Sequence, residues 1–550
     1  METAGSTRIA NALTWQVGAR HDLGVAERLI AGDEPDGVYG IADARIVDHF
    51  LCFIDDLGVG GALRRLRPAG VKRETIPAEL YILVYFLRCL ARIPSQESLP
   101  DLLFSDTALM FRLGFNAHQI EHGVTQRSAA RRKGPRRNLP VDPEAVTDNV
   151  VKLDLGEVKC FLHDALRKLW AVHPSVPAKG LYIIDGSMIE PGESTKGAGR
   201  TSRSKTVKTT DGNKTVNEVI LGFKMVWMWS AETGLPVAVA MGTAEKDERA
   251  FVRELVNQAK EVLAGRGEIG TILLDHGFLD GPGLYELDAA GIRFVMPARH
   301  DLKVYEEARR AVVNDVPTHV RHPGSRTRPV RRRVAGGGAL KVENRTIEAV
   351  GVERCTTFTT FAPAADVDDG EHRRRFRKDF AAKRINAVVL TREDGREKVD
   401  FVLLTNGPVT RPLAVVDDYD ERSLIENQGH RELKQAWHLE KPPRRTAAGT
   451  EIHMSFVVLA YALTQGYRAW LDAQVKEDDA GSPTTLGQAV RRIAAENHDK
   501  LLVFVGDVYG IYFTSEAFML LGRNVKRPNP KGAPNLDALI ERLRASTPKG

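Results

Sequence analysis

The sequence predicts an α/β protein with a mixed-sheet core, a β-rich insertion within that core, and helical regions at the N-terminal and C-terminal ends. Three observations carry this prediction. Apolar residues recur at helical spacing over most of residues 1–178. From Leu181 onward, short apolar runs alternate with helical segments, which is typical of a sheet flanked by helices. Residues 301–399 are rich in Arg, Gly, Thr and Val and show short alternating segments, which favour strands.

The elements follow in order along the chain. Helices are expected over 63–66, 78–93, 99–113 and 156–170. The core then begins with a strand at 181–185, a hairpin of 218–230 with 237–241, a helix at 247–263, a strand at 271–275, a helix at 283–290 and a strand at 293–298. A strand at 400–407 and a long helix at 418–437 follow the insertion. These elements divide the chain into regions 1–178, 179–300, 301–399, 400–465 and 466–550.

Composition narrows the class of protein. The chain has 550 residues, of which 43% are hydrophobic and 27% charged, as in ordinary globular proteins. The N-terminus lacks a cationic stretch followed by an apolar one, so we expect no signal peptide. The longest apolar stretch, 454–467, is interrupted at Thr464 and Gln465 and is shorter than the ~20 residues of a spanning helix. A membrane protein is therefore not expected.

The four cysteines are far apart and form no C-x-x-C pair. This spacing excludes a disulfide framework and a zinc knuckle, and it favours a reducing cytoplasm. We expect four buried, unpaired side chains at Cys52, Cys89, Cys160 and Cys355.

Charge is more informative by position than in total. The net charge is only +6, but three Arg-rich tracts occur at 126–137, 321–333 and 372–378. A single basic tract is usually a solvated loop. Three tracts near expected boundaries favour a polyanionic partner.

Two expected strands end on a carboxylate, Asp185 and Asp275. One such residue is usually a turn or cap residue. On adjacent strands the two carboxylates would lie side by side, and a divalent cation is the usual relief of their repulsion. Ligation by oxygen alone suits Mg²⁺ or Mn²⁺ rather than Zn²⁺.

A third carboxylate is available on the helix expected at 418–437. At 100° per residue, one narrow stripe of that helix carries Tyr419, Arg422, Glu426 and His430. The alternative interpretation of this stripe is a solvated helix face.

With these residues the chain resembles the DDE transposases of bacterial insertion sequences. The resemblance covers roughly residues 181–465 and is carried by IID at Asp185, LLDHGF at Asp275, and VLLTN followed by YDERSLIENQGHRELKQAW. The last run is similar to the Y-x2-R-x3-E-x6-K signature of a subgroup with a β-rich insertion before the final Glu. The resemblance implies an RNase H-like core and a catalytic, metal-binding triad of Asp185, Asp275 and Glu426 with two Mg²⁺ ions, or Mn²⁺ in their place.

The resemblance also implies the partners. These are double-stranded DNA with terminal inverted repeats, target DNA, and a second copy of the chain in a homodimer on paired ends. The N-terminal region would bind DNA or dimerise, and the protein would act in the bacterial cytoplasm at the nucleoid. The side chains expected to contact DNA are Tyr419, Arg422, His430, Arg431 and Lys434.

One position departs from the signature. Leu433 stands seven residues after Glu426, where the signature has Lys, and Lys434 comes one residue later. One residue is about 100° of helix rotation, so an undistorted helix turns Lys434 off the stripe. In that case His430 or Arg431 would contact phosphate instead.

The function expected from the sequence is cut-and-paste transposition, by cleavage at the element ends and strand transfer. Two alternatives stay open: an RNase H-like nuclease without strand transfer, and an inactive DNA-binding relic of a transposase. His276, which follows Asp275, is expected to be an exposed loop residue rather than a metal ligand.

Overall fold

The computed structural model describes fifteen segments of the chain. They are residues 19–41, 47–70, 76–115, 119–120, 123, 139–192, 194–209, 212–313, 319–333, 340–363, 383–394, 397–478, 485–506, 508–522 and 535–546. Two compact units make up the chain. The core unit is residues 175–434, and the flanking unit combines residues 1–174 with residues 435–550.

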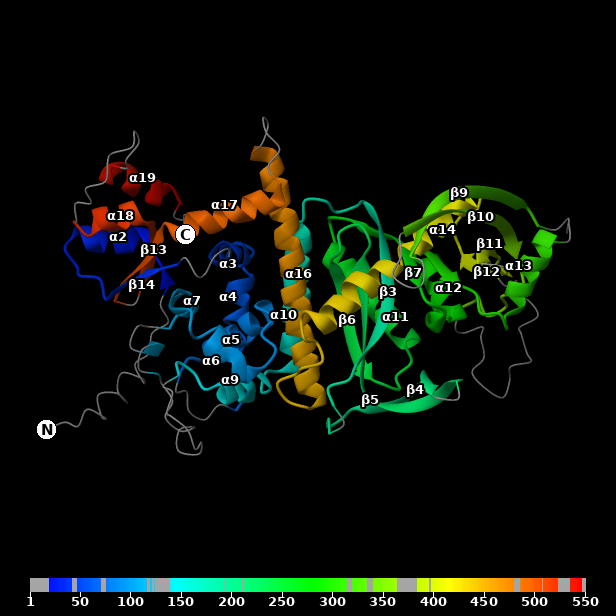
Figure 1. The fold of residues 1–550 in the computed structure, drawn as a ribbon, viewed down its shortest axis with the longest axis horizontal. Helices are drawn as coiled ribbons and strands as arrows, with labels where there is room; N and C mark the ends of the chain where they lie inside the picture. The colour runs from blue at the N-terminus through cyan, green and yellow to red at the C-terminus, as the bar shows by residue number, and fades with distance from the viewer. Residues whose placement is uncertain are drawn as a thin grey trace. The chain divides into compact units, whose positions relative to one another are not determined.

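The core unit is built on a large mixed sheet (Figure 1). Its first five core strands are β3 (Lys179–Ile189), β5 (Gly212–Ser230), β6 (Pro236–Thr243), β7 (Glu268–Leu274) and β8 (Arg293–Pro297). They lie in the order β6-β5-β3-β7-β8, with the first three antiparallel and the last three parallel. This is the RNase H-like arrangement that the family resemblance implies.

The strands of the β-rich insertion extend this same sheet. Beyond β8 come β12 (Glu397–Thr405), β11 (Ile385–Asp394), β10 (Leu340–Cys355) and β9 (Arg321–Arg333), each antiparallel to its neighbour. The insertion begins with a helix that the sequence analysis did not predict, α13 (Lys303–Val313). The basic tract 321–333 forms β9, whereas the tracts 126–137 and 372–378 lie outside the described residues.

Three further helices pack on this sheet. Helix α11 (Arg249–Leu263) lies on β5 and β6, and it buries one side because its apolar residues recur at helical spacing. Helix α12 (Gly281–Ala289) packs on β8, and α14 (Pro412–Asp420) packs on β8 to β11. Two ion pairs fix α14 to the sheet: Arg293 with Asp418 at 2.9 Å and Arg326 with Asp417 at 2.6 Å. One further strand, β4 (Gly199–Thr209), pairs with the first half of β5.

The central strand β3 explains why the sequence shows a continuous apolar run before Asp185. Tyr182, Ile183 and Ile184 are all fully buried, on both faces of the sheet. A strand covered on both faces has no polar alternation, so it appears in the sequence as an unbroken apolar run.

The flanking unit is largely helical. Its centre is formed by α5 (Ala78–Leu90), α9 (Pro143–Val150), α10 (Leu155–Val172) and α16 (Ala447–Asp478), and Figure 1 shows α10 and α16 side by side. By length and composition α16 is the one described helix that is able to cross a membrane, but 83% of its most apolar window is buried in the protein. A core helix passes the same test.

The remaining helices of the flanking unit are short. They are α2 (Asp22–Ile30), α3 (Val47–Asp56), α4 (Val59–Leu63), η2 (Gln96–Ser98), α6 (Leu99–Leu102), α7 (Thr107–Leu113), α17 (Leu486–His498), α18 (Thr514–Leu520) and α19 (Leu536–Ser546). The predicted helix 156–170 is confirmed as α10. The prediction of one helix over 99–113 is wrong, because Asp106 caps a second helix, α7, and accepts a hydrogen bond from the Leu109 amide.

A small sheet joins the two ends of the chain within the flanking unit. Its strand order is β1 (Ala19–Arg20), β14 (Val508–Phe513), β13 (Lys500–Val505) and β2 (Gly37–Gly40). Helices α2, α18 and α19 form a hydrophobic core with this sheet. The sequence pattern did not predict these strands. The hairpin of β13 with β14 is local, but β1 and β2 pair with residues more than 450 positions away in the chain.

A buried histidine links the central helices of the flanking unit. His453 on α16 is 1% exposed, and its Nδ1 accepts a hydrogen bond from the Tyr85 hydroxyl at 2.8 Å. Its Nε2 donates to the His438 carbonyl at 3.0 Å. Both ring nitrogens are therefore used by a neutral imidazole. Burial, assisted by the positive charge of Arg88, lowers the pKa of His453 to about 3.

This histidine predicts a pH dependence of stability. Below pH 6.5 the unfolded chain takes up a proton at His453 that the folded chain does not, so the free energy of unfolding falls as the pH falls. From pH 7 to pH 5 this one group lowers it by about 2 kcal/mol. Urea unfolding at both pH values measures the effect, and H453Q should show a smaller decrease. An equal decrease in H453Q would contradict the assignment.

Candidate active site

Asp185 and Asp275 lie at neighbouring positions on two parallel strands. In the register of β3 and β7, Ile184 is paired with Leu274. Asp185 follows Ile184 within β3, and Asp275 comes directly after the last residue of β7. Asp185 is also paired with Trp227 on β5. The expectation that the strand ends on Asp185 is wrong, because β3 continues to Ile189 by pairing with β5, and only its parallel pairing with β7 stops at Ile184. The side chain of Asp185 is 12% exposed and that of Asp275 is 30% exposed. The parallel register thus brings the two carboxylates to one edge of the sheet.

The turn after β7 holds Asp275 in place. Its carboxylate caps the short helix η4 (His276–Phe278) and accepts a hydrogen bond from the Gly277 amide at 3.3 Å. The Nδ1 atom of His276 contacts Asp275 Oδ1, and the rest of the His276 side chain is exposed. This agrees with the expected loop position of His276.

Glu248 is a neighbour of this edge that the sequence analysis did not identify. A Cβ atom placed on either Gly186 or Gly277 would lie 3.1 Å from a Glu248 carboxylate oxygen. Lys224 balances its charge at 3.1 Å. These glycines follow the two aspartates closely, so Glu248 packs over the backbone that carries them. No motif in the sequence marks this contact, because the three segments meet only in the folded sheet.

The segment that carries Glu426 is not the single helix expected over 418–437. Helix α14 ends at Asp420, a turn follows, and residues Ile425–His430 form a π-helix, η6, that continues into α15 (Arg431–Gln435). Tyr419 therefore lies at the end of one helix and Glu426 in the next. The prediction of a regular stripe is wrong here, although its members still approach one another.

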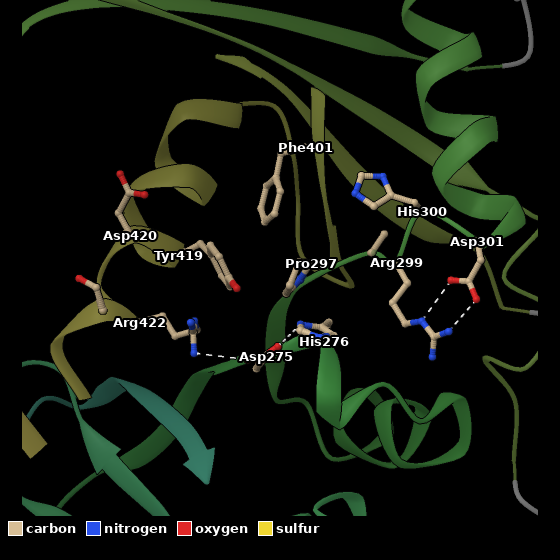
Figure 2. Close-up of a pocket in the computed structure, with 12 residues that line it drawn as sticks. Asp275, His276, Pro297, Arg299, His300, Asp301, Phe401, Tyr419, Asp420 and Arg422 are labelled. Carbon is tan, nitrogen blue, oxygen red and sulfur yellow. Dashed lines mark hydrogen bonds and ion pairs between the residues drawn. The ribbon is translucent and has the colours of Figure 1, made fainter. Parts of the chain in front are cut away.

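Arg422 lies between the three carboxylates. Its Nη1 is 3.8 Å from Asp185 Oδ1 and 3.8 Å from Asp275 Oδ2, and its Nη2 is 2.7 Å from Glu426 Oε1. Figure 2 shows this side chain directed at Asp275. Burial alone would lower the pKa of Arg422, but the neighbouring anionic groups outweigh it and raise the pKa. The guanidinium thus supplies the positive charge that three nearby carboxylates require.

His430 contacts the second carboxylate oxygen of Asp185. Its Nε2 is 3.4 Å from Asp185 Oδ2, and its ring centroid is 5.5 Å from that of Trp227. Both ring nitrogens, like Arg422 Nη1, are buried and make no hydrogen bond. Buried donors without a partner are uncommon and often mark a place where a ligand binds. Of these atoms, Arg422 Nη1 and His430 Nε2 lie next to Asp185.

The π-helix changes the position of Lys434. A π-helical turn takes up one more residue than an α-helical turn, so residues after it are displaced by one position in the helix register. Eight residues that include this turn rotate about as far as seven α-helical residues, which brings Lys434 within about 20° of the direction of Glu426. Leu433 is fully buried and Lys434 is partly exposed, as this register requires. Arg431 is exposed at the start of α15.

The side chains present fit divalent cations. The donors are carboxylate oxygens, which suit Mg²⁺ or Mn²⁺. The oxygens of Asp185, Asp275 and Glu426 do not all lie within 4.8 Å of one another in the described chain. Glu426, whose side chain is 53% exposed, is held instead by Arg422. Asp185 and Asp275 would hold a shared cation, and Glu426 would reach it after leaving the guanidinium.

A cavity of about 790 Å³ opens beside Asp275 and Arg422 (Figure 2). Phe401 and Tyr419 line one side, with ring centroids 6.1 Å apart, and Arg299 and His300 line another. Burial raises the pKa of Tyr419 to about 12, so its hydroxyl stays protonated at neutral pH. The cavity combines aromatic faces and cationic groups next to the carboxylates.

The sheet presents Asp185 and Asp275 side by side, and Arg422 links both to Glu426 on the following helix. The model of the transposase DDE domain family matches residues 177–463, more than half of the chain, and the protein belongs to this family. It is therefore a transposase, whose family acts on DNA and uses divalent metal ions.

Two other comparisons were less informative. A piggyBac transposase, solved in a synaptic complex with hairpin DNA, is similar at 11% sequence identity with a TM-score of 0.36, covering 96% of this chain and 88% of that one. The comparison with curated proteins finds no match.

The close packing of Gly429 in the π-helix against Trp227 predicts that this position does not tolerate a larger side chain. A Cβ atom on Gly429 would lie 2.5 Å from Trp227 Cζ2, so G429A has to move either the π-helix or the tryptophan. We expect the free energy of unfolding to fall by about 1–3 kcal/mol. DNA cleavage should fall more than about tenfold, because the helix that carries Glu426 is displaced. Denaturant unfolding and a plasmid cleavage assay measure the two effects.

The matched control is G61A on α4. The nearest atom to a Cβ there is 3.9 Å away, so this helical glycine has room for a methyl group. G61A should keep both stability and cleavage, with a gain of up to about 1 kcal/mol. If G429A behaves like G61A, the close contact does not position the helix.

Proposed function

We propose that this transposase moves its element by a cut-and-paste reaction, in which it cleaves DNA at the element ends and joins them to target DNA. The observation that carries this proposal is the convergence of Asp185, Asp275 and Glu426 on Arg422, within 3.8 Å for each aspartate. Carboxylates at this spacing are costly without countercharge, and the family to which the chain belongs uses such carboxylates with metal ions.

Each side chain has a proposed role in this reaction. Asp185, Asp275 and Glu426 would together hold two Mg²⁺ ions, or Mn²⁺ in their place. When bound, these ions supply a metal-activated oxygen nucleophile and stabilise the charge on the leaving 3′ oxygen. When the Arg422 guanidinium moves to a phosphate, the Glu426 carboxylate would be free to turn toward the two aspartates. The buried donors of His430 and Arg422 favour a phosphate beside Asp185.

DNA binding is proposed for the same region of the core unit. Tyr419, Arg422, His430, Arg431 and Lys434 would contact the backbone near the cleaved phosphate. Strand β9 carries one of the Arg-rich tracts and would add sequence-independent affinity. The proposed substrates are terminal inverted repeats and target DNA, held by a homodimer of a bacterial insertion-sequence transposase of the Y-R-E-K subgroup. The proposed location is the bacterial cytoplasm at the nucleoid.

Substitution of the triad tests the catalytic assignment. D185N, D275N and E426Q each remove one anionic ligand and nearly keep its volume, so we expect plasmid cleavage in Mg²⁺ to fall more than about 100-fold. The control D247N removes a carboxylate that pairs with Arg249 at the surface, and it should cleave at the wild-type rate. Cleavage that survives any of the three triad variants would remove that residue from the site.

The same assay separates the proposal from its alternatives. Plasmid that carries the DNA flanking the coding region, offered with target DNA, should give joined products as well as cleaved ends. Cleavage without joined product would favour a nuclease, and salt-sensitive binding without cleavage in Mg²⁺ or Mn²⁺ would favour an inactive relic.

Lys434 predicts a change in the salt dependence of DNA binding. If this side chain contacts one phosphate, K434Q should reduce the magnitude of the negative slope by about 1. The slope is that of the logarithm of the DNA association constant against the logarithm of the salt concentration. K476Q is the control, because Lys476 is exposed and pairs with Asp472 on α16. Binding measured by fluorescence anisotropy over a range of NaCl concentrations gives both slopes.

A deletion tests whether the π-helix sets this contact. Gln428 is exposed within η6, and its removal restores a seven-residue spacing between Glu426 and the lysine in a regular α-helix. We expect this deletion to keep the wild-type slope. A slope reduced as far as in K434Q would show that the register argument is wrong.

A further inference from the structure

A second group of potential metal ligands lies in the core unit, in a part of the sheet that the proposed reaction does not use. Among the described residues, the side chains of Glu307, His319 and Cys355 place one ligand atom each within 4.8 Å of the other two. Glu307 lies on α13, His319 precedes β9, and Cys355 ends β10. None of the three lines the cavity beside Asp275.

The histidine is held in the orientation that metal-binding histidines adopt. His319 Nδ1 is 3.1 Å from the Glu353 carbonyl, which can only accept, so Nδ1 carries the proton. In the neutral ring Nε2 then has a free electron pair, and this atom lies 3.5 Å from Glu307 Oε1. Two electron-pair donors at this distance repel each other unless a cation or a proton lies between them. A ring N–H that donates to a backbone carbonyl is the usual support of a metal-bound histidine.

The carboxylate of Glu307 is fixed as an anion. It accepts hydrogen bonds from the backbone amides and hydroxyls of Thr356 and Thr357, at distances from 2.7 to 3.1 Å. Burial alone would raise the pKa of Glu307, but these bonds outweigh it and lower the pKa. The side chains of Glu307 and His319 are only 12% and 9% exposed. The loop after β10 therefore holds a negative charge in the protein interior beside the imidazole.

The backbone before Cys355 is irregular in a way that completes the group. The register of β10 and β11 shifts between Val352 and Cys355, and Arg354 has a φ of 66°. A left-handed conformation costs a non-glycine residue roughly 1 kcal/mol, so the surrounding structure must maintain it. Arg354 stands between the residue whose carbonyl orients His319 and the residue that supplies the thiol. The irregular backbone thus places both the Glu353 carbonyl and the Cys355 thiol beside His319.

We propose that Glu307, His319 and Cys355 bind one Zn²⁺ ion, with water in the fourth position. A thiolate, an imidazole and a carboxylate together favour Zn²⁺ over Mg²⁺. Tetrahedral Zn²⁺ places such ligand atoms about 3.3–3.6 Å apart, and the His319 to Glu307 distance is 3.5 Å. On binding, the Cys355 thiol loses its proton to solvent and the sulfur bonds to the metal. The ion joins α13 to the base of the β9–β10 hairpin.

Burial distinguishes this cysteine from the others only in part. Cys89 is also buried, and burial raises the pKa of both thiols to about 12. Cys160 is exposed and Cys52 is half-buried, which corrects the expectation of four buried cysteines. Cys89 lies on α5 near Tyr85 and Arg88, with no histidine or carboxylate group of this kind around it in the described chain. It therefore provides a matched control.

The test uses the full-length protein stripped of metal with a chelator and then loaded with Zn²⁺ or Co²⁺. Excess Mg²⁺ is present throughout, so that the oxygen ligands at Asp185 and Asp275 do not contribute. We expect one Zn²⁺ per chain to remain after dialysis, measured by elemental analysis. The Co²⁺ form should show a thiolate-to-metal absorption band. C355S should lose that band, and C355S and H319Q should each weaken Zn²⁺ binding at least about tenfold.

The control C89S should retain both the Zn²⁺ and the band. Circular dichroism identifies variants that are folded, and H319Q keeps a side chain able to donate to the Glu353 carbonyl. The proposal is overturned if folded wild-type protein retains no Zn²⁺. It is overturned equally if C355S and H319Q bind Zn²⁺ as tightly as C89S, or if the Co²⁺ form shows no thiolate band.

Discussion

The charge balance around Arg422 is the interaction on which the arrangement of the core unit depends. Three carboxylates from β3, from the end of β7 and from a π-helix meet around one guanidinium, with Arg422 Nη2 2.7 Å from Glu426. Without this positive charge, the three carboxylates would repel one another, and this repulsion would push η6 away from β3 and the end of β7. The same guanidinium is the group that holds Glu426, 2.7 Å from its carboxylate, while lying 3.8 Å from each aspartate.

The extended sheet explains how an insertion is accommodated without disturbing this site. The insertion strands continue the sheet antiparallel from β8, and α14 is fixed to them by Arg293 and Arg326. The turn after α14 then delivers Arg422 and Glu426 to the edge formed by β3 and β7. The Glu307, His319 and Cys355 group lies where the insertion begins and where β10 ends, and both α13 and α14 pack on β10.

The π-helix shows how a departure from a sequence signature is absorbed. The chain carries one residue more than the signature between Glu426 and the lysine. An α-helix would turn Lys434 away by about 100°, but six π-helical residues take up the extra position. Gly429 is required inside this turn because Trp227 leaves no room for a Cβ. The irregular helix is thus packed closely against β5 at Gly429.

The sequence by itself determined the α/β character of the core and the two aspartates that follow apolar runs, because these depend on local apolar patterns and on the residues next to them. The apolar run before Asp185 and the run before Asp275 indicate buried strands without any knowledge of their partners. Only the tertiary structure decided the parallel register that sets the aspartates side by side, the π-helical turn before Lys434, the sheet shared by both chain ends, and the meeting of His319 with Cys355. Each of these depends on contacts between segments far apart in the chain, which local patterns do not encode.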